Sequence, residues 1–271
     1  MIINHNINAM NSHRNLSFNV SQSGKSSEKL SSGYRINRAA DDAAGLAISE
    51  KMRAQLRSMN QGMRNTQDGI SLVQATEGAL NEVSDMLGRM KELATQAANS
   101  TYSDTDVGYI KDEVDRLISQ IDDIAAKTEF NGRTTLDGQL GATFTIQTGG
   151  KITDAIVLDF TQVDMTNLTN GIGPITDNAS AATELANIDT AIETVNKARS
   201  YLGAYQNQME HSYNNSSVNA ENLQAAESRI RDTDMAAEMM KYTKFNILQQ
   251  ASTAMLAQAN QAPQGVLQLL R

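Results

Sequence analysis

The sequence has 271 residues, with no cysteine, no tryptophan and only two prolines, and aromatic residues make up 4% of it. Strands favour aromatic and β-branched residues, and their turns favour proline and glycine, so this composition disfavours a sandwich or barrel of many short strands. The absence of cysteine excludes thiol nucleophiles, disulfide frameworks and cysteine metal sites. A mainly helical fold is therefore the first expectation.

Signatures of enzymes are also missing. The three histidines, His5, His13 and His211, lack the mutual spacing and the carboxylate partners that catalysis requires. No nucleophile-elbow, phosphate-loop or dinucleotide-binding fingerprint occurs. Three acidic pairs lack the remaining ligands of a calcium loop, and we interpret them as helix caps or solvated side chains: Asp41 with Asp42, Asp104 with Asp106, and Asp232 with Asp234. We expect no catalysis, no cofactor and no bound metal.

Long apolar runs are absent as well. No stretch approaches 18 apolar residues, and the first residues do not join a basic region to an apolar one, so we expect neither a membrane span nor a signal peptide.

Charge is segregated along the chain: residues 1–66 carry nine Lys or Arg against four Asp or Glu, residues 67–228 carry nine against 24, and residues 229–271 carry five against three. No basic patch is dense enough, or aromatic enough, to bind nucleic acid.

The dominant pattern that is present is helical. From Met52 to Ala97 the apolar positions step by three and four, which indicates a coiled-coil seam of more than six heptads. Two steps of three, from Ile70 through Val73 to Thr76, interrupt the repeat as a stammer. Four glycines within the seam each oppose a free-standing helix by roughly 1 kcal/mol, so packing against a partner must compensate for Gly62, Gly69, Gly78 and Gly88.

Two further seams follow. One covers residues 110–124, with Ser103 and Asp104 as possible caps, and the other covers residues 185–213 and includes Arg199. Between residues 130 and 177 the period changes to the alternation of strands, as in residues 156–160, and glycines mark turns. The sequence predicts a mainly α protein: a rod-like bundle of three long helices with narrow apolar stripes and a small β-hairpin excursion at about residues 131–180.

The two ends of the chain are weaker amphipathic segments. Residues 1–34 offer few apolar side chains among many Asn and Ser, and residues 235–270 have no obvious core of their own. We therefore expect both ends to be ordered by a partner. The apolar residues expected to make this contact are Ile3, Ile7, Met10, Met255, Leu256, Val266, Leu267, Leu269 and Leu270.

Segments at opposite ends of the chain carry a specific family resemblance. Residues 3–17 and 30–50 closely resemble the start of bacterial flagellin, and residues 228–235 and 252–271 resemble its C-terminus equally well. The match covers about residues 1–136 and 180–271. Because about 45 residues separate the two matching regions, the chain resembles a short flagellin without the variable outer domains.

The resemblance implies a structural subunit that self-assembles into the bacterial flagellar filament for swimming motility. Residues 1–42 and 232–271 would form a filament-core domain whose terminal helices pair as a separate coiled coil and are disordered in the free subunit, and residues 43–231 would form the helical rod. The subunit would be exported unfolded through the flagellar type III apparatus to an extracellular filament. Its partners would be other copies of itself, the export apparatus, an export chaperone, and the filament cap and hook-junction proteins.

The resemblance also implies a patch on the rod that the host Toll-like receptor for flagellin recognises. It places the key residues at Arg89 and Leu93, with Glu113 on the adjacent helix. Arg89 and Leu93 are four residues apart and are therefore expected on one face of their helix. The alternative interpretation of Arg89 is a solvated charge that helps subunits to pack.

Two other functions stay open at this point. A different flagellar axial protein, such as a hook-filament junction protein, would share the terminal helices. A secreted amphipathic adhesin or membrane-active protein would bind lipid as a monomer. Neither membrane insertion nor nucleic-acid binding is expected.

Overall fold

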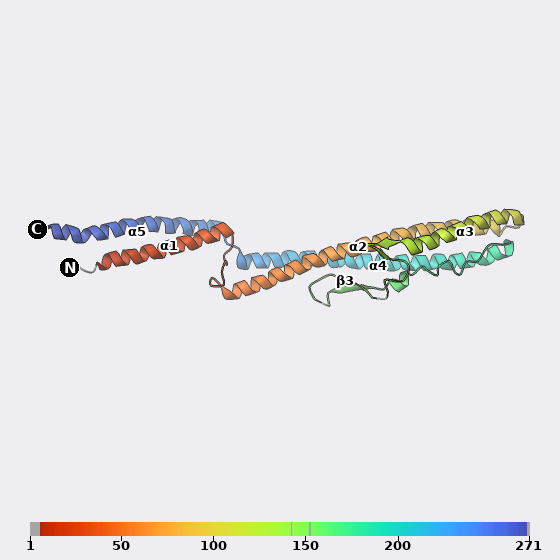
Figure 1. Ribbon diagram of the computed structural model, residues 1–271, viewed down its shortest axis with the longest axis horizontal. Helices are drawn as coiled ribbons and strands as arrows, with labels where there is room; N and C mark the ends of the chain where they lie inside the picture. The colour runs from red at the N-terminus through yellow and green to blue at the C-terminus, as the bar shows by residue number, and fades with distance from the viewer. Residues whose placement is uncertain (1–5, 142, 152, 270–271) are drawn as a thin grey trace. The chain divides into compact units, whose positions relative to one another are not determined.

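The residues that the structure describes form five long helices and two small strand pairs (Figure 1). The computed structural model describes the backbone of residues 6–269 apart from 142 and 152, and describes side chains as far as residue 261. Contacts divide the chain into two units, one of residues 1–56 with 221–271 and one of residues 57–220. The elements are α1 (Ile7–Ser32), α2 (Ala43–Ala97), α3 (Asp104–Lys127), β1 (Glu129–Phe130), β2 (Arg133–Thr134), β3 (Phe144–Gln147), β4 (Ala155–Leu158), a 3-10 turn η1 (Phe160–Val163), α4 (Asn178–Arg231) and α5 (Met235–Leu269).

The boundaries between the two units fall inside α2 and α4. The predicted domain boundaries, at residues 42 and 232, lie instead at the ends of these helices. That division stays a prediction about the assembled subunit, and the two units are described separately below.

Helix α2 supplies the longest stripe of the core in residues 57–220. Val73, Leu80, Val83, Leu87 and Met90 are fully buried, as the predicted seam requires. The buried stripe is wider than that seam, because Leu72 and Leu93 are buried beside it. Side chains of α3, of α4 and of the strands all join the same apolar cluster. A helix that is covered on several sides needs an apolar stripe broader than two positions per heptad.

Helix α3 begins at the predicted cap. The Ser103 side chain accepts a hydrogen bond from the Asp106 backbone N–H, and the Asp106 carboxylate accepts one from the Ser103 backbone N–H, which completes a capping box. After α3 ends, β1 and β2 form a hairpin in which Asn131 and Gly132 both adopt positive φ angles, 52° and 73°. This is the two-residue turn that the Asn-Gly pair favours.

Helix α4 continues without a break through the third predicted seam. Ile188, Val195, Leu202 and Met209 are buried as expected. Arg199 lies half-buried at the edge of the seam: its neighbour Ala198 is fully buried, and the Arg199 guanidinium forms an ion pair with Glu77 of α2 at 3.5 Å. The small Ala198 fills the narrow centre of the interface, while the longer Arg199 side chain covers its edge and holds its charge against Glu77.

The β excursion is confirmed as two antiparallel pairs. Strands β3 and β4 pair Ile146 with Ile156 and Phe144 with Leu158, and these residues alternate with the outward-facing pair of Thr145 and Val157. The strand predicted at residues 156–160 ends at Leu158, because the Asp159 carboxylate accepts a hydrogen bond from the Thr161 backbone N–H and starts the 3-10 turn.

The terminal helices α1 and α5 pack side by side and antiparallel (Figure 1). The seam between them is mostly small or polar. Asn19 and Ser26 are buried on α1, and Asn19 donates a hydrogen bond to the Ser252 hydroxyl at 3.1 Å. The buried or half-buried residues recur at heptad spacing as Ala9, Ser12, Leu16, Asn19, Ser23, Ser26 and Leu30 on α1, and as Glu238, Tyr242, Phe245, Gln249, Ser252, Leu256 and Ala259 on α5. The predicted separate pairing of the terminal helices is confirmed.

Candidate assembly surface and recognition patch

The two turns that flank the terminal helices are joined by backbone hydrogen bonds. The Arg35 N–H donates to the Arg231 carbonyl at 2.7 Å, and the Thr233 N–H donates to the Gly33 carbonyl at 3.0 Å. Tyr34 and Asp232 form an antiparallel bridge between these bonds. The family resemblance rests on residues 30–50 and 228–235, and the structure brings these two segments from opposite ends of the chain into direct contact.

Charged and aromatic side chains reinforce this junction. The guanidinium groups of Arg53 and Arg231 lie 5.6 Å and 5.0 Å from the centre of the Tyr34 ring, within the range of a cation–π contact. Arg53 also forms an ion pair with the mostly buried Glu227 at 3.4 Å, and Arg231 forms one with Glu50. Sequence reasoning missed this cluster, although the tyrosine and arginines of the two resembling segments were a signal that could have found it.

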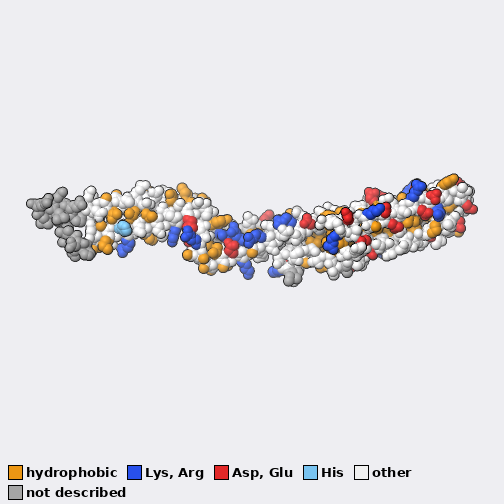
Figure 2. All heavy atoms as spheres, viewed as in Figure 1, with side chains coloured by type: hydrophobic (Ala, Val, Ile, Leu, Met, Phe, Trp, Pro, Cys, Tyr) orange, Lys and Arg blue, Asp and Glu red, His pale blue; other side chains and the backbone are white. Residues whose placement is uncertain are grey.

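The terminal helix pair leaves several large apolar side chains exposed outside the seam. Phe18 on α1 and Met240 and Ile247 on α5 are 58%, 70% and 60% exposed. Figure 2 shows hydrophobic side chains on the visible face of this pair. We name the following residues the terminal apolar surface: Ile7, Met10, Phe18 and Val20 of α1, and Met235, Met239, Met240, Ile247, Leu248 and Met255 of α5.

The predicted contact residues at the chain ends divide into three groups. Ile7, Met10 and Met255 belong to the terminal apolar surface. Leu256 lies half buried on the seam, where it lines a shallow groove between α1 and α5 with Met10 and His13. Ile3 and Leu270 lie outside the described residues, and the side chains of Val266, Leu267 and Leu269 do as well.

The predicted recognition patch is brought together in part. Arg89 and Glu113 form an ion pair between α2 and α3, with 2.9 Å between guanidinium nitrogen and carboxylate oxygen, and Arg89 also pairs with Glu92 at 3.2 Å. The hydrogen bond that Arg89 donates to the Glu113 carboxylate raises the pKa of Arg89 above its ordinary value. Leu93 is 3% exposed and belongs to the core, so it does not share an exposed face with Arg89. The expected apolar contact one turn after Arg89 is therefore absent from the surface.

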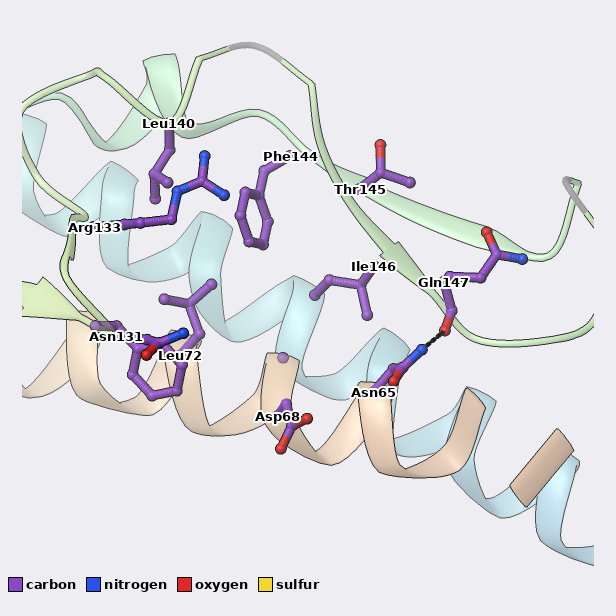
Figure 3. Close-up of a pocket in the computed structure, with 12 residues that line it drawn as sticks. Asn65, Asp68, Leu72, Asn131, Arg133, Leu140, Phe144, Thr145, Ile146 and Gln147 are labelled. Atoms are coloured by element: carbon purple, nitrogen blue, oxygen red, sulfur yellow. Dashed lines mark hydrogen bonds between the residues drawn. The ribbon is translucent and has the colours of Figure 1, made fainter. Parts of the chain in front are cut away.

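A cavity of about 380 Å³ lies between α2 and strand β3 (Figure 3). Leu72 and Ile146 line its apolar part, Arg133 lies over the ring of Phe144 at 5.4 Å, and Asn65 closes one end by donating to the Gln147 carbonyl at 2.9 Å. The Asp68 carboxylate is the acidic group of the lining. This arrangement has neither a nucleophile next to a base nor a set of metal ligands, so it defines no catalytic centre.

The acidic pairs act largely as helix caps, as predicted. The Asp42 carboxylate accepts from the Gly45 N–H at the start of α2, and the Asp234 carboxylate accepts from the Ala236 and Ala237 N–H groups at the start of α5. Among the residues that the structure describes, no group of three or more His, Cys, Asp or Glu side chains is arranged to hold a metal ion. None of the described helices combines the length and apolar character that crossing a membrane requires.

A chain whose ends pair through a polar seam and carry an exposed apolar surface has the architecture of a self-associating structural subunit. Comparison with known families agrees. Residues 3–140 match the bacterial flagellin N-terminal helical region, and residues 185–270 match the bacterial flagellin C-terminal helical region. The chain belongs to the bacterial flagellin family, as a short member without outer domains. It is a structural subunit of the extracellular flagellar filament and not an enzyme.

Individual relatives align with this chain over their whole length. The chain is 54% identical to a flagellin of Halalkalibacterium halodurans and 48% identical to a flagellin of Bacillus subtilis, and each alignment covers all of both chains. It is 47% identical to the flagellar filament 33 kDa core protein of Treponema phagedenis, again over all of both chains. These matches favour the filament subunit over the junction protein and over the adhesin.

Solved structures show the same fold. The crystal structure of Bacillus cereus flagellin is 38% identical with a TM-score of 0.53, over 60% of this chain and 94% of that one. A putative flagellar hook-associated protein from Vibrio parahaemolyticus has a TM-score of 0.61 over 71% of this chain and all of that one. Since it is only 13% identical, it shows a shared fold alone.

Proposed function

We propose that the terminal apolar surface is the contact through which each subunit binds neighbouring copies in the filament. The observation that carries this proposal is the set of large apolar side chains that the terminal helix pair leaves exposed. The fully buried positions of its seam are the polar residues Asn19, Ser26 and Glu238, whereas Phe18 and Met240 face outward. An isolated helix pair normally buries its apolar residues in the seam, so a pair of this kind is suited to a place where both of its faces are covered.

The energetics favour association. Fully burying a large apolar side chain contributes about 1.5–3 kcal/mol, and a side chain that is already half buried contributes about half as much. The ten residues of the terminal apolar surface are 38–70% exposed, so burying them between copies makes a large favourable contribution to the free energy of association. It has to offset the loss of translational and rotational freedom on association, which costs at least about 4 kcal/mol.

The experiment is seeded growth of purified subunits on short filament fragments, followed by electron microscopy. Ile247→Asn should stop growth, because Ile247 is 60% exposed in the subunit and would place an amide in the buried contact. The matched control is Ile247→Leu, which keeps the apolar volume and should grow normally. Circular dichroism of both free variants should equal that of the parent chain. Normal growth of Ile247→Asn would remove this residue from the assembly contact.

We further propose the partners that family membership suggests. Before assembly the terminal apolar surface needs cover, and an export chaperone that binds it would supply that cover while the chain is delivered, unfolded, to the flagellar export apparatus. At the ends of the filament the same surface would meet the cap and the hook-junction proteins. A chaperone that binds the parent chain and Ile247→Asn equally well would contradict this use of the surface.

Recognition of free subunits by the host Toll-like receptor is a separate proposal, which rests on Arg89 and Glu113. Their side chains are about half exposed and form an interhelical ion pair that offers a planar cation beside a carboxylate. Leu93 is buried and would not contact the receptor; it would only hold α2 in place by packing in the core. Arg89→Ala should weaken receptor binding by at least about 1 kcal/mol if Arg89 is a hot spot. Lys91→Ala is the matched control, because Lys91 is an exposed cation of the same helix that pairs with Asp189 instead.

A further inference from the structure

The methionines of the chain fall into sharply different environments. Five lie on the terminal helix pair with 48–70% of their surface exposed, and we call these the terminal methionines: Met10, Met235, Met239, Met240 and Met255. Three others are no more than 1% exposed in the core of residues 57–220, and we call these the core methionines: Met90, Met165 and Met209. The terminal methionines make up half of the terminal apolar surface.

Exposure matters because the methionine thioether is a redox-active group. Hydrogen peroxide transfers one oxygen atom to the sulfur: an S–O bond forms, the O–O bond breaks, the sulfur loses two electrons, and the second peroxide oxygen leaves as water. The product, methionine sulfoxide, replaces an apolar side chain with a polar one and disrupts methionine-rich interfaces. A thioether that is packed in a core is out of reach of the oxidant.

The position of the terminal methionines makes this reaction consequential. Met235 and Met239 are four residues apart on α5 and share one face, and Met240 follows immediately with 70% of its surface exposed. Oxidation of these residues would place several sulfoxides on the surface that must be buried when copies associate.

We propose that the terminal methionines are an oxidation site that determines whether a free subunit can enter the filament. The inference rests on the proposed assembly contact. In the free subunit, peroxide converts these side chains to sulfoxides and the subunit is rejected by the growing end. In the filament, neighbouring copies cover the same side chains and protect them.

The first test measures where oxidation occurs. Free subunits and assembled filaments are treated with hydrogen peroxide, and the sulfoxide content of each methionine is followed by mass spectrometry of peptides. In free subunits, the terminal methionines should oxidise at least about ten times faster than the core methionines, which serve as an internal control. In filaments, the rate at the terminal methionines should fall by a similar factor. Equal rates in the two states would overturn the proposal.

The second test measures the consequence for assembly. Oxidised subunits should need at least about a tenfold higher concentration for seeded growth, since burial of one unpaired polar group costs of order 1–3 kcal/mol and 1.4 kcal/mol is a factor of ten. Treatment with the two methionine sulfoxide reductases and a thiol reductant should restore growth. If oxidised subunits grow as well as untreated ones, the oxidation proposal is overturned while the assembly contact stands.

A variant with leucine at all five terminal methionines isolates their contribution. It preserves the apolar volume, so it should assemble and should keep assembling after peroxide treatment. The control variant has leucine at the half-buried Met52, Met59, Met63 and Met86, and it should stay sensitive to peroxide. If the five-leucine variant also stops growing after peroxide, damage elsewhere is responsible and the proposal is overturned. If untreated parent subunits do not grow on seeds, the assembly proposal itself has failed.

Discussion

The glycines of α2 make a sharp prediction, because the same substitution should have opposite effects along one helix. A Cβ at Gly62 would lie 2.1 Å from the carbonyl oxygen of Thr148, which is a backbone atom that cannot rotate away. Gly62→Ala therefore has to displace the loop after β3, and with it the hydrogen bond from Asn65 to the Gln147 carbonyl at 2.9 Å. At Gly78 and Gly88, nothing lies within 4 Å of the added Cβ.

The magnitudes follow from these contacts. Overpacking costs about 1–3 kcal/mol and the lost hydrogen bond about 1 kcal/mol, whereas replacing glycine by alanine inside a helix gains up to about 1 kcal/mol. Gly62→Ala should lower the free energy of unfolding by about 1–3 kcal/mol, and Gly78→Ala and Gly88→Ala should each raise it by about 0.5–1 kcal/mol. Thermal unfolding of the full chain, followed by circular dichroism, should show shifts of about 2–4 °C per kcal/mol. A melting temperature for Gly62→Ala as high as that of Gly78→Ala would refute the close approach.

Three further predictions concern other parts of the chain. Leu93→Ala should lower the free energy of unfolding in urea by about 2–5 kcal/mol because Leu93 is buried, whereas Arg89→Ala should change it by less than about 1 kcal/mol because its ion pairs are exposed. Burial opposes ionisation of Glu238, but hydrogen bonds from Ser26 and Lys241 and the charges of Lys241 and Lys29 outweigh this effect and lower the pKa of Glu238 below 4.5. Pairing of α1 with α5 should therefore be stabilised above pH 4.5 and should weaken as the pH falls through the lowered pKa. Glu238→Gln should abolish this pH dependence, measured by amide exchange. Amide exchange in α1 and α5 should be fast in free subunits, because their seam is mostly small or polar, and it should be slow in filaments. Strong protection of both helices in a proven monomer would contradict this.

Hydrophobic periodicity predicted the long helices well because each one buries a continuous stripe. The seams along α2 and α4 were recognisable from leucine, isoleucine, valine and methionine at steps of three and four. Hydrophobic periodicity did not predict how wide the buried stripe of a helix is, because that width depends on how many other elements pack against the helix. Leu93 lies one position outside the predicted seam and is nevertheless buried, because α2 packs into a core shared with α3 and α4. A single sequence does not state how many faces of a helix are covered.

The terminal helices show a second limit. Their apolar residues were recognised, and the expectation that they lack a core within the subunit agrees with the outward direction of Met10 and Met240. The polar residues that help to pair α1 with α5, such as Asn19 and Ser252, were not predicted, because small and polar side chains leave no hydrophobic signal. The junction around Tyr34 depends on contacts between residues about 200 positions apart, which local patterns do not reveal.

The central claim is that the terminal apolar surface is buried between copies of the chain, and a cryo-electron microscopy reconstruction of filaments grown from this protein tests it most directly. We predict that Phe18, Met240 and Ile247 each lie within about 4.5 Å of apolar atoms of a neighbouring subunit. A reconstruction in which these side chains face water, while the subunits are joined only through residues 57–220, would contradict the claim.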